Sequence, residues 1–191
     1  MNALWYVGRG TGLVSILLLT LVVALGVANR CGRRVLGLPR FAVAAVHRSA
    51  SLLGVVFVAV HVLTLLLDPD ARLSVLDLVL PFHAALSPFW YGLGTVAFDL
   101  LAALVVTSLL RARIGPRVWR GVHWLAYACW PIALGHGLGS GSDAGSGWML
   151  VVVGVCVAAV LGAVAWRFSP RFAEVDDRRA ATIPRPTAGA R

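Results

Sequence analysis

Apolar residues dominate the chain in long blocks, and polar residues fall mainly in the short segments between them. Five blocks are long enough to cross a bilayer, at about 4–27, 41–67, 89–110, 118–138 and 148–166. A hydrocarbon core about 30 Å thick needs about 20 apolar residues in helical form. The strict alternation of apolar and polar residues that is typical of membrane β-strands is absent. The pattern therefore predicts an all-α fold, an integral membrane bundle of five transmembrane helices.

Charged residues in the connections predict how these helices are oriented. All 17 basic residues are arginines, and most of them fall in three segments, at 30–40, 111–120 and 167–191. The other two connections carry acidic residues, namely Asp68, Asp70, Asp77 and Asp143. Positively charged connections stay on the cytoplasmic side. We therefore expect the N-terminus outside, the C-terminus in the cytoplasm, and a first helix that is retained rather than cleaved as a signal peptide.

Composition agrees with a membrane protein and excludes some other classes. With 59% hydrophobic residues and a mean hydropathy of +0.85, the chain is too apolar for an ordinary soluble domain. We expect one membrane domain over residues 1–168 and a disordered cytoplasmic tail over 169–191. The net charge of +9 follows the topology, so we expect contact with a lipid bilayer and no nucleic-acid partner. The glycine motifs of nucleotide-binding folds are missing, so we expect no flavin domain in this chain.

Four of the five histidines fall within the predicted helices in a regular pattern. His47 and His61 lie 14 residues apart in the second block, and His123 and His136 lie 13 apart in the fourth. Each pair spans about 20 Å at 1.5 Å per residue. Because both helices are expected to run outward, His47 and His123 share a depth near the cytoplasm, and His61 and His136 share a depth near the outer face. Two stacked pairs of imidazoles are suited to axial ligation of haem iron.

The spacing leaves alternatives open. Thirteen steps of about 100° miss the starting face by about 140°, so His123 and His136 cannot share one face of a straight helix. Either Pro131 kinks the helix between them, or two haems bind at different azimuths. Zinc and copper fit less well, because their ligands cluster closely or include cysteine and carboxylate. A different class of function is a small proton or solute transporter, in which the histidines and the intramembrane Asp99 would relay protons.

Three segments resemble the ferric reductase-like transmembrane family. They are WYVGRGTG at 5–12, HRSASLLGVVFVAVH at 47–61 and WRGVHWLAYACWPIALGH at 119–136, and the resemblance extends over about 4–168. This family includes the membrane domains of NADPH oxidases and the haem subunit of the bacterial periplasmic methionine sulfoxide reductase. The resemblance implies haem b, one or two with two preferred. The inner iron would be bound by His47 and His123, and the outer iron by His61 and His136.

The same resemblance implies a role in transmembrane electron transfer. A chain without its own flavin domain is similar to the short stand-alone bacterial members, which implies the bacterial cell membrane. A separate cytoplasmic flavoprotein or a quinol would donate electrons, and ferric iron or a periplasmic reductase would accept them at the outer face. The chain would then be the membrane haem subunit of an oxidoreductase.

Three charged residues within the predicted helices are further candidates for a role at these sites. Arg9 matches a region where the family places a basic residue near the outer haem, so we expect it to bind haem propionates, with anchoring to headgroups as the alternative. Arg48 has the same two interpretations at the inner site. Asp99 lies near the bilayer midplane, and Arg9 is its expected counter-charge.

Overall fold

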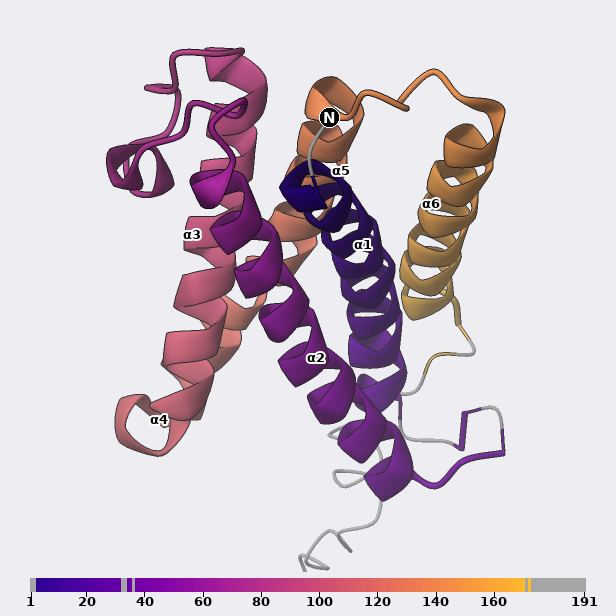
Figure 1. The fold of residues 1–191 in the computed structure, drawn as a ribbon. Helices are drawn as coiled ribbons and strands as arrows, with labels where there is room; N and C mark the ends of the chain where they lie inside the picture. The colour runs from indigo at the N-terminus through magenta and orange to yellow at the C-terminus, as the bar shows by residue number, and fades with distance from the viewer. Residues whose placement is uncertain (1–2, 32–33, 36, 171, 173–191) are drawn as a thin grey trace, which may run out of the picture.

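The computed structural model describes residues 3–31, 34–35, 37–170 and 172, and these residues form a bundle of helices (Figure 1). In chain order the elements are α1 (Ala3–Arg30), α2 (Arg40–Leu67), the 3₁₀ helix η1 (Val75–Leu78), α3 (Pro88–Leu109), α4 (Arg111–His123), α5 (Ala126–Ser140) and α6 (Gly147–Arg167). No strand occurs within the described ranges, so the all-α prediction is confirmed. The predicted disordered tail lies almost entirely outside the described residues.

Four of the five predicted spans are present as continuous helices. α1, α2, α3 and α6 are each long and apolar enough to cross a membrane. The block at 118–138 is instead divided between α4 and α5. α5 has 15 residues, which corresponds to about 22 Å of helix, less than the thickness of about 30 Å that a single span must cross. The chain is therefore a multi-pass membrane protein with four long helices and one divided block.

The division comes from a tighter turn between α4 and α5. The N–H of Leu125 donates to the carbonyl of Val122 at 2.9 Å, and the N–H of Tyr127 donates to that of Trp124 at 3.1 Å. Bonds between residues three apart are of the 3₁₀ type, which is wound more tightly than the α-helix. Apolar patterning does not register this change, because the apolar block at 118–138 continues through it.

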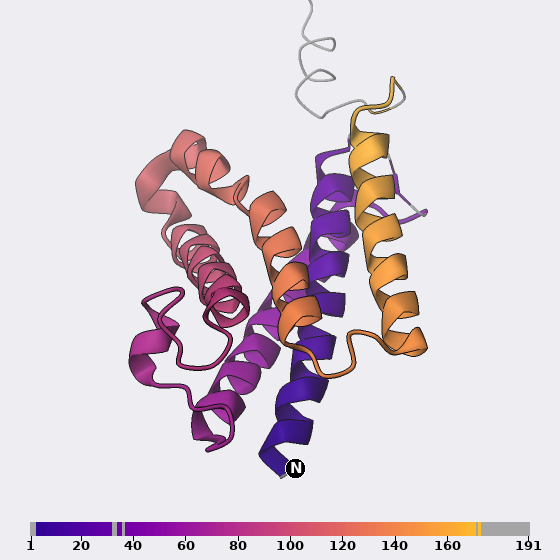
Figure 2. The ribbon, with the colours of Figure 1, turned by 90° about the horizontal axis from the view of Figure 1, so that it is seen from above.

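The helices are arranged as two packed pairs with one helix outside them. α1 packs along α2, and α3 packs along α5, while α6 packs against α1 (Figures 1 and 2). α1 also contacts α5 and so joins the two pairs. The buried core lies where α1, α5 and α6 meet, around Val23, Trp130, Cys156 and Val160. There the indole N–H of Trp130 donates to the hydroxyl of Thr20 at 2.9 Å.

Large apolar side chains cover the outside of the bundle. On α2, for example, Leu52 is 64% exposed and Val56 is 56% exposed. In water an apolar surface of this kind is unfavourable, whereas in a bilayer it contacts acyl chains at no such cost. The exposed surface therefore agrees with a protein embedded in the membrane.

The connection between α2 and α3 is fixed to the end of the bundle by polar contacts around Asp77. The backbone N–H and the hydroxyl of Ser74 both donate to the Asp77 carboxylate at 2.8 Å. These two hydrogen bonds hold the pKa of the Asp77 carboxyl below its usual value. The hydroxyl of Thr95 in α3 donates to the Asp77 carbonyl at 2.6 Å. Leu76 and Val79 are exposed, so this segment has a polar side fixed to the bundle and an apolar side facing away from it.

Candidate functional site

The four histidines of the predicted spans come together as two pairs. His47 of α2 and His123 at the end of α4 have ring centroids 6.5 Å apart and planes inclined by 68°. His61 of α2 and His136 of α5 have ring centroids 6.3 Å apart and planes inclined by 76°. In each pair one ring comes from the α1–α2 pair of helices, and the other comes from the α4–α5 segment beside α3. These are the same two pairs that the spacing predicted.

Three of the four rings are held by hydrogen bonds to backbone carbonyls of other helices. Nδ1 of His47 lies 3.1 Å from the carbonyl oxygen of Val22, and Nδ1 of His61 lies 2.7 Å from that of Gly8. Nδ1 of His136 lies 2.9 Å from the carbonyl oxygen of Trp90. A carbonyl oxygen can only accept, so Nδ1 must carry the proton in each ring. The lone pair of the neutral imidazole is then on Nε2, where it is available to a metal. Histidines that ligate metals almost always have such a partner on the other nitrogen.

His123 is held differently from the other three. Its ring stacks on that of Trp119, with centroids 4.9 Å apart and planes inclined by 28°. Its Nδ1 is buried and has no hydrogen-bond partner within the described part of the chain. The helical turns that carry His123 begin at Pro116, directly after Gly115, whose φ is 79°. Glycine accepts a positive φ readily, and proline is suited to the first turn of a helix.

The turn between α4 and α5 contributes to the azimuths of His123 and His136. A residue in a 3₁₀ turn advances by about 120°, against about 100° in an α-helix. The tightened segment therefore rotates His136 back toward the face of His123. Pro131, which the sequence suggested as the site of a kink, lies inside α5 and does not divide the helix. The interruption is at Trp124 and Leu125, where the chain has neither proline nor glycine.

A cavity of about 430 Å³ adjoins the pair formed by His61 and His136. His61 and His136 line it together with Arg9, Gly12 and Asp143, among others. This volume lies within the range of about 300–1,000 Å³ that is usual for ligand and cofactor sites. The cavity is lined mainly by apolar side chains, and its charged lining residues are Arg9 and four aspartates, Asp68, Asp70, Asp77 and Asp143.

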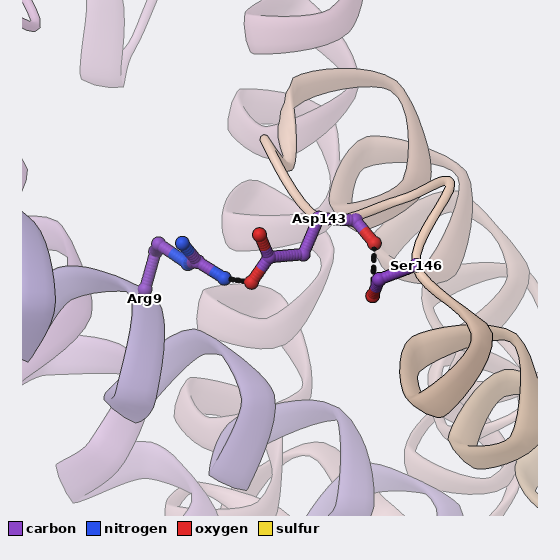
Figure 3. A network of polar contacts seen from close by, with 3 residues as sticks. All are labelled: Arg9, Asp143 and Ser146. Carbon is purple, nitrogen blue, oxygen red and sulfur yellow. Dashed lines mark hydrogen bonds and ion pairs between the residues drawn. The ribbon is translucent and has the colours of Figure 1, made fainter.

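An ion pair joins Arg9 to another lining residue of this cavity. The Arg9 guanidinium pairs with the carboxylate of Asp143 in the connection between α5 and α6 (Figure 3), and it lies 4.4 Å from the ring centroid of Trp5. The hydroxyl of Ser146 donates to the Asp143 carbonyl at 2.7 Å. The predicted pair of Arg9 with Asp99 is therefore wrong, and Asp99 is instead exposed on α3. Residue spacing does not predict that the α5–α6 connection folds over α1, so the sequence did not indicate Asp143 as the partner of Arg9.

Comparison with known families identifies the domain. The family model described as "Ferric reductase like transmembrane component" matches residues 11–134, more than half of the 191 residues. The chain belongs to this family. No curated protein and no solved structure matches it. The ferric reductase-like match includes His47, His61 and His123 and ends two residues before His136.

Sequence reasoning missed the backbone groups that hold the histidines of this ferric reductase-like domain. Because every residue has a backbone carbonyl, nothing in the sequence marks Val22 or Trp90 as a hydrogen-bond acceptor. A signal exists in the glycines of α1, because Gly12 and Gly26 are 14 residues apart, as are His47 and His61. Arg48 is exposed on α2, and its binding of a haem propionate stays a prediction.

Proposed function

We propose that this chain binds b-type haem on its two histidine pairs and transfers electrons across the membrane. The observation that carries the proposal is the separation of the ring centroids, 6.5 Å in one pair and 6.3 Å in the other. Two imidazoles on opposite sides of a metal ion, each bonded at about 2 Å, have ring centroids about 6 Å apart. Both pairs meet this condition, and they use helices that are far apart in the sequence.

The residues of both pairs fit this cofactor. His47 and His123 would ligate the inner haem, and His61 and His136 the outer one. The hydrogen bonds from Nδ1 to backbone carbonyls orient three of these rings and raise the basicity of Nε2. Haem iron with two imidazole ligands supplies one-electron transfer and has no open position for oxygen. The protein's own groups bind, orient and exclude water, and they form no bonds with a substrate.

The arginine distribution supports a direction for this transfer. We infer that α5 and the turn before it complete a fifth crossing, with the N-terminus outside and the C-terminus in the cytoplasm. The inner pair then lies near the cytoplasmic surface, where a separate flavoprotein or a quinol would donate electrons. The outer pair lies near the other surface, where ferric iron or a periplasmic reductase would accept them. In this role the chain is the membrane haem subunit of an oxidoreductase in a bacterial cell membrane.

Two arginines are suited to the haem propionates. Arg9 lines the cavity of the outer pair, and its guanidinium can bind a carboxylate through two hydrogen bonds. It already pairs with Asp143, so a propionate would share or replace that partner. Arg48 follows His47 and would have the corresponding role at the inner site.

A visible spectrum with a haem-to-protein ratio tests the proposal. The purified chain, expressed with ample haem, should show a low-spin b-type spectrum and a ratio of up to two. Replacing His47 or His123 with alanine should remove one haem signal, and replacing His61 or His136 should remove the other. Phe57→Ala in α2 serves as a control that keeps all four ligands. A colourless wild-type protein would overturn the proposal and would favour the transporter alternative.

A further inference from the structure

The carbonyls that hold three of the histidines share a local sequence feature. A glycine follows each carbonyl four residues later in the same helix, as Gly12 follows Gly8, Gly26 follows Val22, and Gly94 follows Trp90. Two of these units lie in α1 and one lies in α3. We call each unit a carbonyl–glycine cradle, defined by the accepting residue and the glycine four positions after it.

Helix geometry explains why glycine occupies this position. The carbonyl of one residue accepts the N–H of the residue four positions later, and it has a second lone pair for the imidazole N–H. Residues four apart lie on the same face of a helix, so a side chain on the later residue would stand beside that oxygen. Glycine leaves the oxygen open and lets the imidazole ring lie against the helix backbone.

The rings lie close enough to these glycines for an added methyl group to matter. A Cβ built at Gly94 would be 2.7 Å from Cε1 of His136, and one at Gly12 would be 3.0 Å from Cε1 of His61. Both distances are shorter than van der Waals contact. At Gly26 the corresponding distance to His47 is 3.5 Å, which is an ordinary contact. The two cradles of the outer pair are therefore tighter than the cradle of the inner pair.

The two histidine pairs differ in the number of cradles. Both rings of the outer pair have one, whereas the inner pair has one at His47 and none at His123. The Nδ1 of His123 is buried without a partner among the described residues, and its ring stacks on Trp119 instead. Loss of such a partner for a ligating histidine typically weakens metal binding about 10–100-fold.

We propose that the carbonyl–glycine cradles position the haem ligands, and that the outer site, with two cradles, holds its haem more tightly than the inner site. This inference rests on the proposed function, because it concerns the relative strength of the two haem sites. Gly12, Gly26 and Gly94 are positioning residues, since they act through the histidines and do not ligate iron.

The experiment measures haem loss from the full-length chain to an excess of apomyoglobin. Wild-type protein should lose haem in a fast and a slow phase. His47→Ala should lack the fast phase, and His61→Ala should lack the slow one. Gly12→Ala and Gly94→Ala should accelerate the slow phase about tenfold or more, and Gly26→Ala should change the fast phase by less. The control is Gly10→Ala in α1, because a Cβ built there meets nothing within 4 Å beyond its own helix backbone and chain neighbours.

The outcomes separate this inference from the proposed function. A colourless wild-type protein contradicts the proposed function itself. Haem-loaded protein in which the inner site loses haem more slowly, or in which Gly12→Ala behaves like Gly10→Ala, overturns only the inference. If the wild type retains a single haem, the inference requires that His61→Ala remove it, and is overturned if only His47→Ala does.

A second variant keeps the test decisive if Gly12→Ala fails to fold. In the double variant Gly12→Ala with His61→Ala, the ring that the new methyl group would meet is gone. Its thermal stability should then equal that of His61→Ala alone. A double variant that remains less stable than His61→Ala would show that Gly12 is needed for another contact, which overturns the positioning role.

Discussion

At the scale of single residues, the charged side chain of Arg9 has two specific partners. Arg9 lies between the Asp143 carboxylate and the Trp5 ring, at the edge of the cavity that adjoins the outer histidine pair. A charge at this position acts on the outer site more strongly than on the inner one, because the two sites are about 21 Å apart along α2. The opposite charges of Arg9 and Asp143 should therefore have opposite effects on the outer haem.

Arg9 and Asp143 should shift the outer haem potential in opposite directions. Arg9→Gln removes a positive charge, favours the oxidised haem and should lower the potential. Asp143→Asn removes a negative charge and should raise it, and the double variant should lie close to the wild type. Redox titration followed by the visible spectrum measures all three. The exposed Asp99→Asn is the control, and equal shifts of both haems would contradict the assignment of Arg9 to the outer site.

Asp77 should make the packing of the α2–α3 connection depend on pH. The hydrogen bonds from Ser74 hold the pKa of the Asp77 carboxyl below its ordinary value of 3.8. The stabilisation is therefore fully present above that value and is lost as the pH falls through the lower pKa of the folded state. Hydrogen exchange in residues 68–87, corrected for intrinsic rates, should rise in acid for the wild type. Asp77→Asn should lack this acid-induced rise in exchange. Because both proteins keep His83, a difference between them is due to Asp77.

At the scale of secondary-structure elements, close packing of α3 against α5 positions His136. A Cβ built at Gly139 in α5 would overlap the indole ring of Trp90, and the carbonyl of Trp90 accepts the hydrogen bond from His136. The contact between the two helices and the orientation of the ligand are thus parts of one arrangement. A change that displaces Trp90 should affect both stability and the outer haem.

Gly139→Ala should destabilise the bundle and perturb the outer haem signal. An extra methyl group in a filled site typically costs about 1–3 kcal/mol, because neighbouring side chains must leave their preferred positions. Gly154→Ala in α6 is the control, since a Cβ added there meets nothing within 4 Å beyond its own helix backbone and chain neighbours. Thermal unfolding and the haem spectrum of the two variants provide the comparison. Equal melting temperatures would show that Trp90 moves aside at no cost.

Apolar patterning predicted the elements well where a block forms one continuous helix. α1, α2, α3 and α6 begin and end within a few residues of the blocks at 4–27, 41–67, 89–110 and 148–166. It failed at 118–138, because the tight turn at Trp124 and Leu125 depends on hydrogen-bond geometry and not on polarity. The histidine pairs were predictable, since residue spacing gives depth. The Asp143 partner of Arg9 was not, because loop paths depend on tertiary packing.

At the scale of the whole molecule, the number of crossings decides where the two ends of the chain lie. An odd number of crossings puts the termini on opposite sides of the membrane, and an even number puts them on the same side. The four long helices alone would give an even number. The divided block of α4 and α5 therefore determines the topology, and with it the side of the membrane that each histidine pair faces.

Reporter fusions should show the ends of the chain on opposite sides of the membrane. A reporter after Arg191 should be cytoplasmic, because arginine-rich segments stay inside. Reporters inserted at Ser142 and placed before Met1 should both be outside. A reporter after Arg113, in the arginine-rich connection that follows α3, is the internal control and should be cytoplasmic. Both ends on one side would mean that α5 does not complete a crossing, and the proposed inner and outer sites would lose their basis.

The equal spacing of the cradles in α1 and of the histidines in α2 has a consequence for the shape of this helix pair. Fourteen residues are two heptads, and an ideal α-helix drifts by about 20° for each heptad. His61 meets Gly8 and Gly12, and two heptads away His47 meets Val22 and Gly26 in the same relation. Both contacts stay on one seam when the helices wind around each other with a left-handed supercoil. The distance between the two histidine pairs is therefore two heptads in α1 as well as in α2.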